Sequence, residues 1–212
     1  MISVVIPAYN EEKTIGFVLD GVKKQINKAE LIVLDDNSKD KTRDIAIEKG
    51  AIVVSNNYNI GVDASLEKGL KMCSGDIIVT LDSDGEHIPE DIKLFLDELS
   101  NGYDFVKGYR EELPRISEKH LEKYSNKKIK LKDPLCSFRV FKREVYDKIG
   151  YYDKLKSYGA EFLFNAVKNG FKVNEIKIKS IRREGVSRIG NKLGANLKLY
   201  KAFFKLVGRF GI

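Results

Sequence analysis

Apolar residues in the first half of the chain follow two spacings that alternate. Short continuous apolar runs, typical of strands buried on both faces of a sheet, are separated by stretches in which apolar residues recur every three or four positions, as in helices. Polar residues, glycine or proline end most of the runs. The predicted strands are 3–6, 31–34, 52–55, 76–81 and 104–107, and the predicted helices are 15–26, 41–49, 62–72 and 92–99.

The second half of the chain repeats this pattern less regularly. Residues 138–141 predict a strand, residues 159–168 a helix, and residues 173–178, whose apolar positions alternate, a strand near the edge of the sheet. Alternating strands and helices favour a mainly parallel sheet with right-handed crossovers. We therefore expect one α/β domain, with the sheet flanked by helices.

The last 22 residues, 191–212, predict a basic amphipathic helix. A face of this kind packs on its own domain or rests on a membrane interface, and the pattern alone is compatible with both. The apolar face contains Leu193, Leu197, Tyr200, Phe203, Phe204 and Val207, and the other face largely contains Lys198, Lys201, Lys205 and Arg209.

Composition supports a globular chain with a single core. The 212 residues are 42% hydrophobic and 33% charged, and no stretch resembles a signal peptide or an uninterrupted membrane span. We therefore expect the protein in the cytoplasm or on the cytoplasmic face of the membrane. Cys73 and Cys136 lack metal-ligand spacing and are expected to be reduced thiols.

The net charge of +7 is concentrated in two segments. Residues 177–212 carry ten Lys or Arg against one Glu, so this segment is +9 and the remainder of the chain is −2. Residues 107–132 carry nine Lys or Arg against four Glu and predict a mobile, partly exposed loop or helix. A solvated surface explains most such runs, but an anionic partner, including nucleic acid on charge alone, fits them as well.

Two aspartates one residue apart, Asp82 and Asp84, directly follow the predicted strand 76–81. The carboxyl ends of parallel strands are where open α/β sheets bind ligands, and hard oxygen ligands suit Mg²⁺ or Mn²⁺ with a substrate diphosphate. The alternative is a simple turn whose aspartates cap the helix that begins near Pro89. Neighbouring motifs favour the metal.

Several ordered motifs together resemble glycosyltransferase family 2, which has the GT-A fold. The resemblance is greatest to the polyprenyl-phosphate glycosyltransferases, the group typified by dolichyl-phosphate mannose synthase. It covers nearly the whole chain and implies a catalytic domain over residues 1–190, followed by the helix 191–212. The matching segments are VVIPAYNEEKTI, LIVLDDNSKDKT, NIGVDASLEKGL, LDSDGEHIPED, DPLCSFRVFKREV and RREGVSRIG.

The resemblance assigns a nucleoside pocket to Pro7, Ala8, Tyr9 and Glu11, with Glu11 accepting hydrogen bonds from the ribose. Asp36 is expected to contact the base. A carboxylate that accepts donors of the base or ribose discriminates strongly between nucleotides. The residue types alone also fit simpler roles, because an acid is favoured in a first helical turn and an aspartate in a turn.

The resemblance assigns the divalent cation, Mg²⁺ or Mn²⁺, to Asp82, Asp84 and Glu86. Glu86 stands where the family commonly has Gln, which predicts tighter metal binding or a different ion preference. Arg182 and Arg188 would help the metal to neutralise the nucleotide leaving group. Without the resemblance, these arginines fit a solvated basic tail equally.

Arg110 and Arg139 are the candidates for binding the acceptor phosphate, and together with Asp84 they form the predicted catalytic set. An anionic lipid phosphate can attack the anomeric carbon without a strong base, so positioning and charge compensation suffice. Family members that act on sugar hydroxyls need a carboxylate base, commonly in a Glu-Asp pair. Here Phe162 follows Glu161, which is therefore expected to be structural.

These inferences predict a metal-dependent, inverting enzyme that moves a sugar from a GDP-mannose or UDP-glucose type of donor to a polyprenyl or dolichyl phosphate. The expected partners are the donor, the lipid-phosphate acceptor, the membrane surface and a membrane protein, with no nucleic acid. The first alternative is an enzyme of the same fold that glycosylates a sugar or protein hydroxyl. The second is a non-catalytic basic adaptor, which leaves the three acids without a role.

Overall fold

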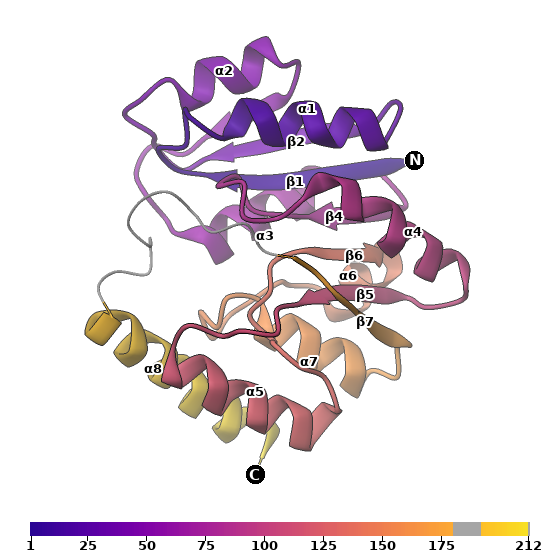
Figure 1. Cartoon of the computed structure of the whole chain (residues 1–212), viewed down its shortest axis with the longest axis vertical. Helices are drawn as coiled ribbons and strands as arrows, with labels where there is room; N and C mark the ends of the chain where they lie inside the picture. Colours follow the sequence, from indigo (N-terminus) through magenta and orange to yellow (C-terminus); the bar gives the residue numbers. More distant parts are fainter. Residues whose placement is uncertain (180–191, 212) are drawn as a thin grey trace.

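A seven-stranded sheet organises the part of the chain that the computed structural model describes, residues 1–179 and 192–211 (Figure 1). The central strands are mostly apolar and are buried between helices on both faces, whereas the two strands at the edges of the sheet are partly exposed. Across the sheet the order is β3 (Ile52–Ser55), β2 (Glu30–Asp35), β1 (Ile2–Ala8), β4 (Ile77–Thr80), β6 (Arg139–Lys142), β5 (Phe105–Tyr109) and β7 (Val173–Lys177).

One strand runs against the others. β6 pairs antiparallel with β4 and with β5, whereas β1 with β2, β1 with β4, β2 with β3 and β5 with β7 are parallel pairs. The mainly parallel sheet that the sequence predicts is therefore confirmed. As a result, the carboxyl ends of β1, β2, β4 and β5 and the first residue of β6 all lie at one edge of the sheet.

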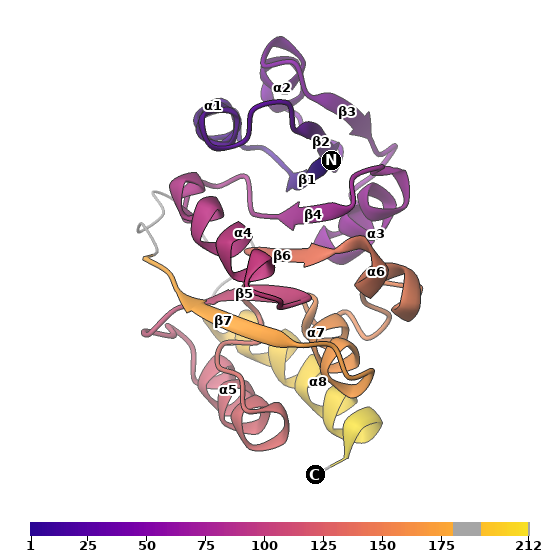
Figure 2. The ribbon, with the colours of Figure 1, turned by 90° about the vertical axis from the view of Figure 1, so that its right-hand side faces the viewer.

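Helices cover both faces of the sheet (Figure 2). One face carries α1 and α4, with α2 beside them, and the other carries α3, α6 and α7, while α5 and α8 pack together outside α7. The bounds are α1 (Ile15–Gln25), α2 (Thr42–Glu48), α3 (Val62–Met72), the 3-10 helix η1 (Pro89–Asp91), α4 (Ile92–Ser100), α5 (Ile116–Ile129), α6 (Arg143–Ile149), α7 (Ala160–Lys168) and α8 (Lys192–Phe210).

The alternation of side chains along β1 divides the core into two layers. Val4 and Ile6 pack toward α1 and α4, whereas Val5 packs toward α3. On α3, Gly69 lies so close to the sheet that an added Cβ would come within 2.5 Å of Leu34 and Val5. A glycine is therefore required at this position for α3 to approach the sheet.

Most predicted elements agree with the structure within two residues. The segments 52–55 and 62–72 match β3 and α3 in full, and β7 lies at the edge of the sheet as predicted. The apolar pattern does not predict α6, and the composition of residues 107–132 is compatible with a loop or a helix. The structure places the end of β5 and the whole of α5 in this basic segment.

The C-terminal helix packs through a face that coincides only in part with the predicted one, because Phe203 and Val207 of the predicted face are half-buried against the core. Ala195, Leu199, Ala202 and Leu206 are buried, whereas Leu197 and Phe204, which the pattern assigns to the apolar face, are exposed. The packed face contacts α5 and α7 through aromatic residues such as Tyr124 and Phe164. In the described part of the chain, no helix has the length and apolar character needed to cross a membrane.

Candidate active site

The predicted nucleoside residues lie at the carboxyl ends of β1 and β2. Pro7 and Ala8 end β1 in register with Leu34 and Asp35 of β2. Both are buried, and Tyr9 is half-buried beyond them. The pairing therefore brings the motif around Tyr9 beside the one that contains Asp36.

Asp36 anchors the loop that leads into α3. Its Oδ1 accepts hydrogen bonds from Asn56 Nδ2 at 3.0 Å and the Ile60 amide at 2.8 Å, and its Oδ2 accepts one from the Gly61 amide at 2.8 Å. A carboxylate has about four acceptor positions, so three donors leave room for roughly one more. Contact with a nucleotide base stays a prediction, and the observed role is to hold the loop.

Glu11 is buried in the turn between β1 and α1. Its amide donates to Thr42 Oγ1 at 2.6 Å, and its Oε2 accepts a hydrogen bond from Thr14 Oγ1 at 2.8 Å. The adjacent Asn10 has a φ of 54° and accepts a hydrogen bond from the Lys39 amide through its side chain. The loops after β1 and β2 therefore fix each other, as a preformed nucleotide pocket requires.

The predicted metal loop follows β4 at the same edge. Ser137 Oγ donates to Asp82 Oδ2 at 2.6 Å, and the Glu86 amide donates to Asp84 Oδ1 at 3.1 Å. Burial raises the pKa of the Glu86 carboxyl, and the negative charges of Asp84 and Asp82 raise it further. The three acids therefore lie within electrostatic range of one another.

The donor set fits a hard divalent cation that is shared with a substrate. Among residues 1–179 and 192–211, no three His, Cys, Asp or Glu side chains are close enough to hold a metal by themselves. Magnesium-type sites commonly use one or two carboxylates and take their other ligands from phosphate and water. Asp82 and Asp84 suit this kind of site, and direct ligation by Glu86 stays a prediction.

His87 is a residue of this region that the sequence analysis missed. It is buried beside Phe138, with the ring centroids 5.6 Å apart. Burial alone would lower its pKa, but the adjacent Cys136 side chain and the charges of Asp82 and Asp84 raise it to about 9. An imidazolium here compensates for the adjacent carboxylates. The sequence feature that could have identified His87 is its position directly after the acidic motif.

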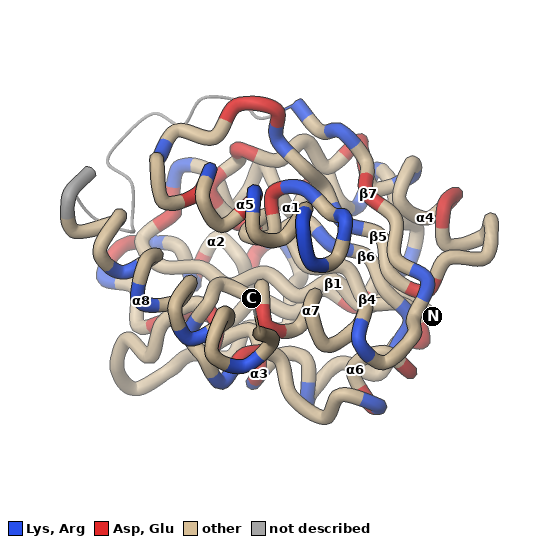
Figure 3. The backbone as a smooth tube through the Cα atoms, turned by 90° about the horizontal axis from the view of Figure 1, so that it is seen from below, with Lys and Arg blue, Asp and Glu red and all other residues tan. Residues whose placement is uncertain are grey.

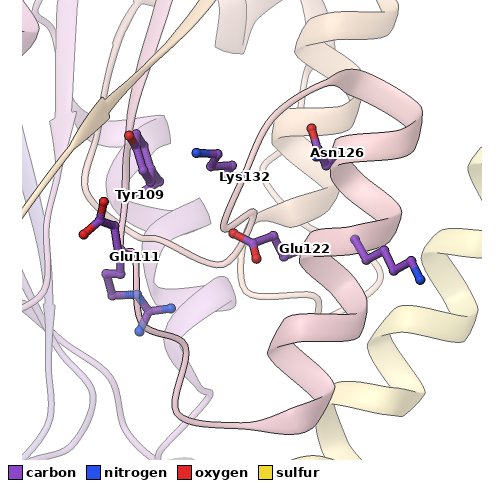
Figure 4. Close-up of a pocket in the computed structure, with 7 residues that line it drawn as sticks. Tyr109, Glu111, Glu122, Asn126 and Lys132 are labelled. Carbon is purple, nitrogen blue, oxygen red and sulfur yellow. The ribbon is translucent and has the colours of Figure 1, made fainter.

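Arg110 lies next to the end of β5, and two carboxylates contact its guanidinium. Nε and Nη2 donate to the two oxygens of buried Asp133 at 2.8 and 3.0 Å, and Glu118 lies 3.9 Å away. Beside it is a cavity of about 360 Å³ between the end of β5 and α5, lined by Tyr109, Arg110, Glu111, Glu122, Lys123, Asn126 and Lys132 (Figure 4). Binding of an acceptor phosphate by Arg110 stays a prediction.

The prediction that Arg139 binds the acceptor phosphate is wrong, because its guanidinium has no N–H left for a substrate. The side chain is fully buried, and its five N–H groups make five hydrogen bonds within the protein. The acceptors are the carbonyl oxygens of Cys136, Gly159, Pro134 and Tyr158 and the hydroxyl of Tyr152. Arg139 therefore holds the segments 134–136 and 152–159 together instead of contacting an acceptor phosphate.

Glu161 is structural, as expected from its neighbour Phe162. The buried carboxylate accepts hydrogen bonds from the Lys154 and Leu155 amides at 2.7 and 2.9 Å, and Arg209 of α8 lies 3.2 Å from it. These contacts fix the loop before α7 against α8. The carboxylate is therefore committed to the protein and is not available as a base.

Asp63 introduces a second buried acid into this network. Its Oδ2 accepts a hydrogen bond from the Tyr158 amide at 3.2 Å, while its Oδ1 is buried with no hydrogen-bond partner among the described residues. Burial and the charge of Asp153 raise the pKa of Asp63 to about 7. No sequence motif predicts that Asp63 and Asp153 lie close together, because the two residues are 90 positions apart.

Two predicted residues, Arg182 and Arg188, lie outside the described residues. The other predicted residues fall into two groups. One group lies at or directly after the carboxyl ends of the parallel strands β1, β2 and β4 and consists of Pro7, Ala8, Tyr9, Glu11, Asp36, Asp82, Asp84 and Glu86. The other group, Arg110 and Arg139, belongs to the part of the edge formed by β5 and β6.

Comparison with known proteins bears on the family and the fold. The family model described as Glycosyl transferase family 2 matches residues 3–150. An uncharacterized protein of Methanocaldococcus jannaschii is 34% identical over 97% of this chain and 90% of its own length. The undecaprenyl-phosphate 4-deoxy-4-formamido-L-arabinose transferase of Pseudomonas fluorescens is 30% identical over 69% of this chain, which matches 48% of the length of that transferase.

The fold is similar to that of solved glucosyl-3-phosphoglycerate synthase structures from Mycobacterium tuberculosis. A complex with phosphoglyceric acid has a TM-score of 0.80 and 25% identity, and covers all of this chain and 80% of the synthase. A complex with Mn²⁺, UDP and phosphoglyceric acid has a TM-score of 0.78 and 26% identity, and covers all of this chain and 79% of the synthase. Because the family model covers most of the chain and the fold agrees with it, this protein belongs to glycosyltransferase family 2 and has the GT-A fold.

Proposed function

We propose that this protein transfers a sugar from a nucleoside-diphosphate sugar to a polyprenyl phosphate, with inversion at the anomeric carbon. The observation that carries this proposal is that the Glu161 carboxylate is already bound within the protein, by two backbone amides and Arg209. Hydroxyl acceptors need a carboxylate base, whereas an acceptor that is already anionic does not. Because Glu161 is buried under Arg209 and two backbone amides, an anionic phosphate is the better nucleophile for this site.

The donor would bind across the ends of β1, β2 and β4. Glu11 and Asp36 would hold the ribose and the base, and Asp82 and Asp84 would face the diphosphate. A bound Mg²⁺ or Mn²⁺ would supply charge neutralisation for the leaving nucleoside diphosphate. The solved relatives that hold Mn²⁺ and UDP support a divalent cation and a uridine nucleotide as the first ligands to test.

The proposed reaction is a single in-line displacement. A phosphate oxygen of the acceptor forms a bond to the anomeric carbon as the bond from that carbon to the donor diphosphate breaks, so an α-linked donor gives a β-linked product. The role of this chain is to align the two substrates and to compensate for their charge. Arg110 and Lys132, which line the cavity, are the cations that we assign to charge compensation of the acceptor phosphate.

A second candidate acceptor is a small phosphorylated hydroxyl compound of the phosphoglycerate type. The overlap of the whole chain with glucosyl-3-phosphoglycerate synthase structures favours it. Both candidate acceptors carry a phosphate, so the same cations serve either one. They differ in the nucleophile, because the small acceptor requires deprotonation of a hydroxyl.

A panel of donors and acceptors tests the proposal. Purified protein with Mn²⁺ is incubated with UDP-glucose, GDP-mannose or UDP-N-acetylglucosamine and with a short polyprenyl phosphate or 3-phosphoglycerate. The expected result is an acid-labile lipid-phosphate sugar from one donor, absent with Asp84→Asn. Transfer to 3-phosphoglycerate alone contradicts the lipid acceptor and supports the second candidate.

A further inference from the structure

Three exposed large hydrophobic side chains gather on the outer helix pair, α5 and α8. Ile116 of α5 is 65% exposed, and Leu197 and Phe204 of α8 are 61% and 66% exposed. Half-buried Tyr200 and exposed His120 lie between the two helices, with the Tyr200 hydroxyl 2.7 Å from His120 Nδ1. We call Ile116, His120, Leu197, Tyr200 and Phe204 the α5–α8 ridge.

Contacts between the helices fix the ridge in place. Ser117 donates to Asn196 Oδ1 through its hydroxyl at 2.6 Å and its amide at 3.1 Å, which brings the adjacent Ile116 and Leu197 to the same end of the helix pair. On α8, Tyr200 stacks on Phe204 at 6.4 Å between ring centroids. The ridge is therefore preformed and needs no rearrangement to present its apolar side chains.

Lysines accompany the ridge on both helices. Lys201 is exposed and lies one turn from both Leu197 and Phe204, and Lys123 and Lys127 continue the line of Ile116 and His120 along α5. The described part of α8 carries no acidic residue. Figure 3 shows blue stretches, which mark Lys and Arg, along the tube of α8. Exposed apolar side chains with flanking lysines are typical of surfaces that bind anionic lipid bilayers.

We infer that the α5–α8 ridge is the membrane-contacting surface of this protein, with Leu197, Phe204 and Ile116 inserted among anionic lipid headgroups. The choice of a bilayer over a second copy of the chain rests on the proposed function, because a polyprenyl phosphate must be taken from a membrane. Lysines all along the ridge also disfavour a self-complementary contact, which would bring like charges together.

The position of the ridge suits the delivery of a lipid substrate. α5 follows the loop after β5, and the first turns of α5 and α8 lie on the same side of the molecule as the carboxyl ends of β1 and β2 (Figure 1). The cavity next to Arg110 is lined in part by α5. A bilayer against the ridge therefore lies beside the edge where the phosphate would react.

Sedimentation with vesicles tests the inference without any sugar transfer. The full chain is mixed with vesicles of equal phosphatidylglycerol and phosphatidylcholine, and the bound fraction is compared for wild type, the ridge variant Leu197→Ser/Phe204→Ser, and the control Phe17→Ser/Leu94→Ser. The control removes side chains that are 59% and 51% exposed on α1 and α4. We expect the partition coefficient of the ridge variant to fall about tenfold or more and that of the control to stay unchanged.

Three results would overturn the inference. In the first, wild type does not bind anionic vesicles. In the second, the ridge and control variants lose vesicle binding equally. In the third, wild type is a dimer that does not bind vesicles, and the ridge substitutions convert it to a monomer. Thermal unfolding of each variant confirms that it is folded. Transfer to a water-soluble short-chain acceptor is measured separately, so failure of the proposed function is distinguishable from failure of the membrane surface.

Discussion

The two halves of the active-site edge use charged residues in opposite ways. At the ends of β1, β2 and β4, acids such as Asp36 and Asp84 belong to loops that leave them half-buried or with acceptor capacity. Around β6 and α7, Arg139 and Glu161 are fully buried, and their hydrogen bonds stay within the protein. Carboxylates such as Asp84 are therefore candidate ligand contacts, Asp36 anchors a loop with acceptor capacity to spare, and Arg139 and Glu161 act as loop anchors alone.

The strongest test of this difference is Asp84→Ala. Loss of the carboxylate that we propose to face the donor diphosphate should lower the transfer rate by about 10³-fold, because charge on the leaving group is then uncompensated. The free energy of unfolding should change little, because Asp84 is half-buried. The rate is measured with saturating Mn²⁺ and donor, and Glu90→Ala, at a nearby exposed acid, is the control. An Asp84→Ala enzyme with near-normal rate contradicts the metal assignment.

Arg139→Met should act mainly on stability. The substitution leaves four buried carbonyl groups and the Tyr152 hydroxyl without their donor, which should cost about 3 kcal/mol or more of the free energy of unfolding. Urea denaturation measures this loss, with Arg43→Met at an exposed position as the control. If Arg139→Met keeps its stability and loses only acceptor affinity, Arg139 belongs to the ligand-contacting half instead.

Asp63→Asn should change how stability depends on pH. The pKa of Asp63 in the folded protein is raised to about 7 by burial and by the charge of Asp153, so its stabilising contribution is complete below the unfolded pKa near 3.8 and is lost as pH rises toward and above 7. Relative to wild type, the variant should gain at least about 1 kcal/mol between pH 4 and pH 8. Urea denaturation at a series of pH values measures the free energy of unfolding of the two proteins. If this free energy changes with pH in the same way for both, the pKa of Asp63 is not raised.

Glu86→Gln should give the smallest effect. Removing one negative charge beside Asp82 and Asp84 should weaken the apparent affinity for Mn²⁺ by a few-fold, and the maximal rate should be nearly unchanged. Titration of the metal with a fixed donor concentration measures the shift. A loss of rate as large as that of Asp84→Ala would show that Glu86 is a direct ligand.

Local patterns predicted the fold better than they predicted the site. The segments 52–55 and 62–72 were identified correctly because apolar spacing and flanking polar residues both mark their ends. The helix α6 was missed because it begins at Arg143 directly after β6 ends at Lys142, so no loop marks its start, whereas the equally short α2 follows a polar loop. The reversed direction of β6 depends on which strands it pairs with, and apolar spacing carries no information on that.

The site shows the same limit at the level of single residues. Asp82 and Asp84 were identified because a strand and its turn are contiguous in sequence. The role of Arg139 depends on Tyr152, Tyr158 and Gly159, which reach it only after the chain folds. Gly159 has a φ of 76°, and a Cβ there would collide with Arg139 and Tyr152, so this glycine is part of the same arrangement. Burial of a charged group is a tertiary property that local spacing does not encode.

The hydrogen bond from Ser137 to Asp82 joins the two halves at the base of the site. Ser137 precedes Arg139 by two residues, and Thr80 of β4 donates a hydrogen bond to the Ser137 carbonyl oxygen at 2.8 Å. The loop that carries Asp82 is therefore connected by hydrogen bonds to the segment that Arg139 holds. If donor binding moves Asp82, the donor side and the segment 134–139 form one coupled equilibrium. Thermodynamic linkage then requires reciprocity, so that an acceptor which tightens donor binding is itself bound more tightly, by the same factor, when the donor is present.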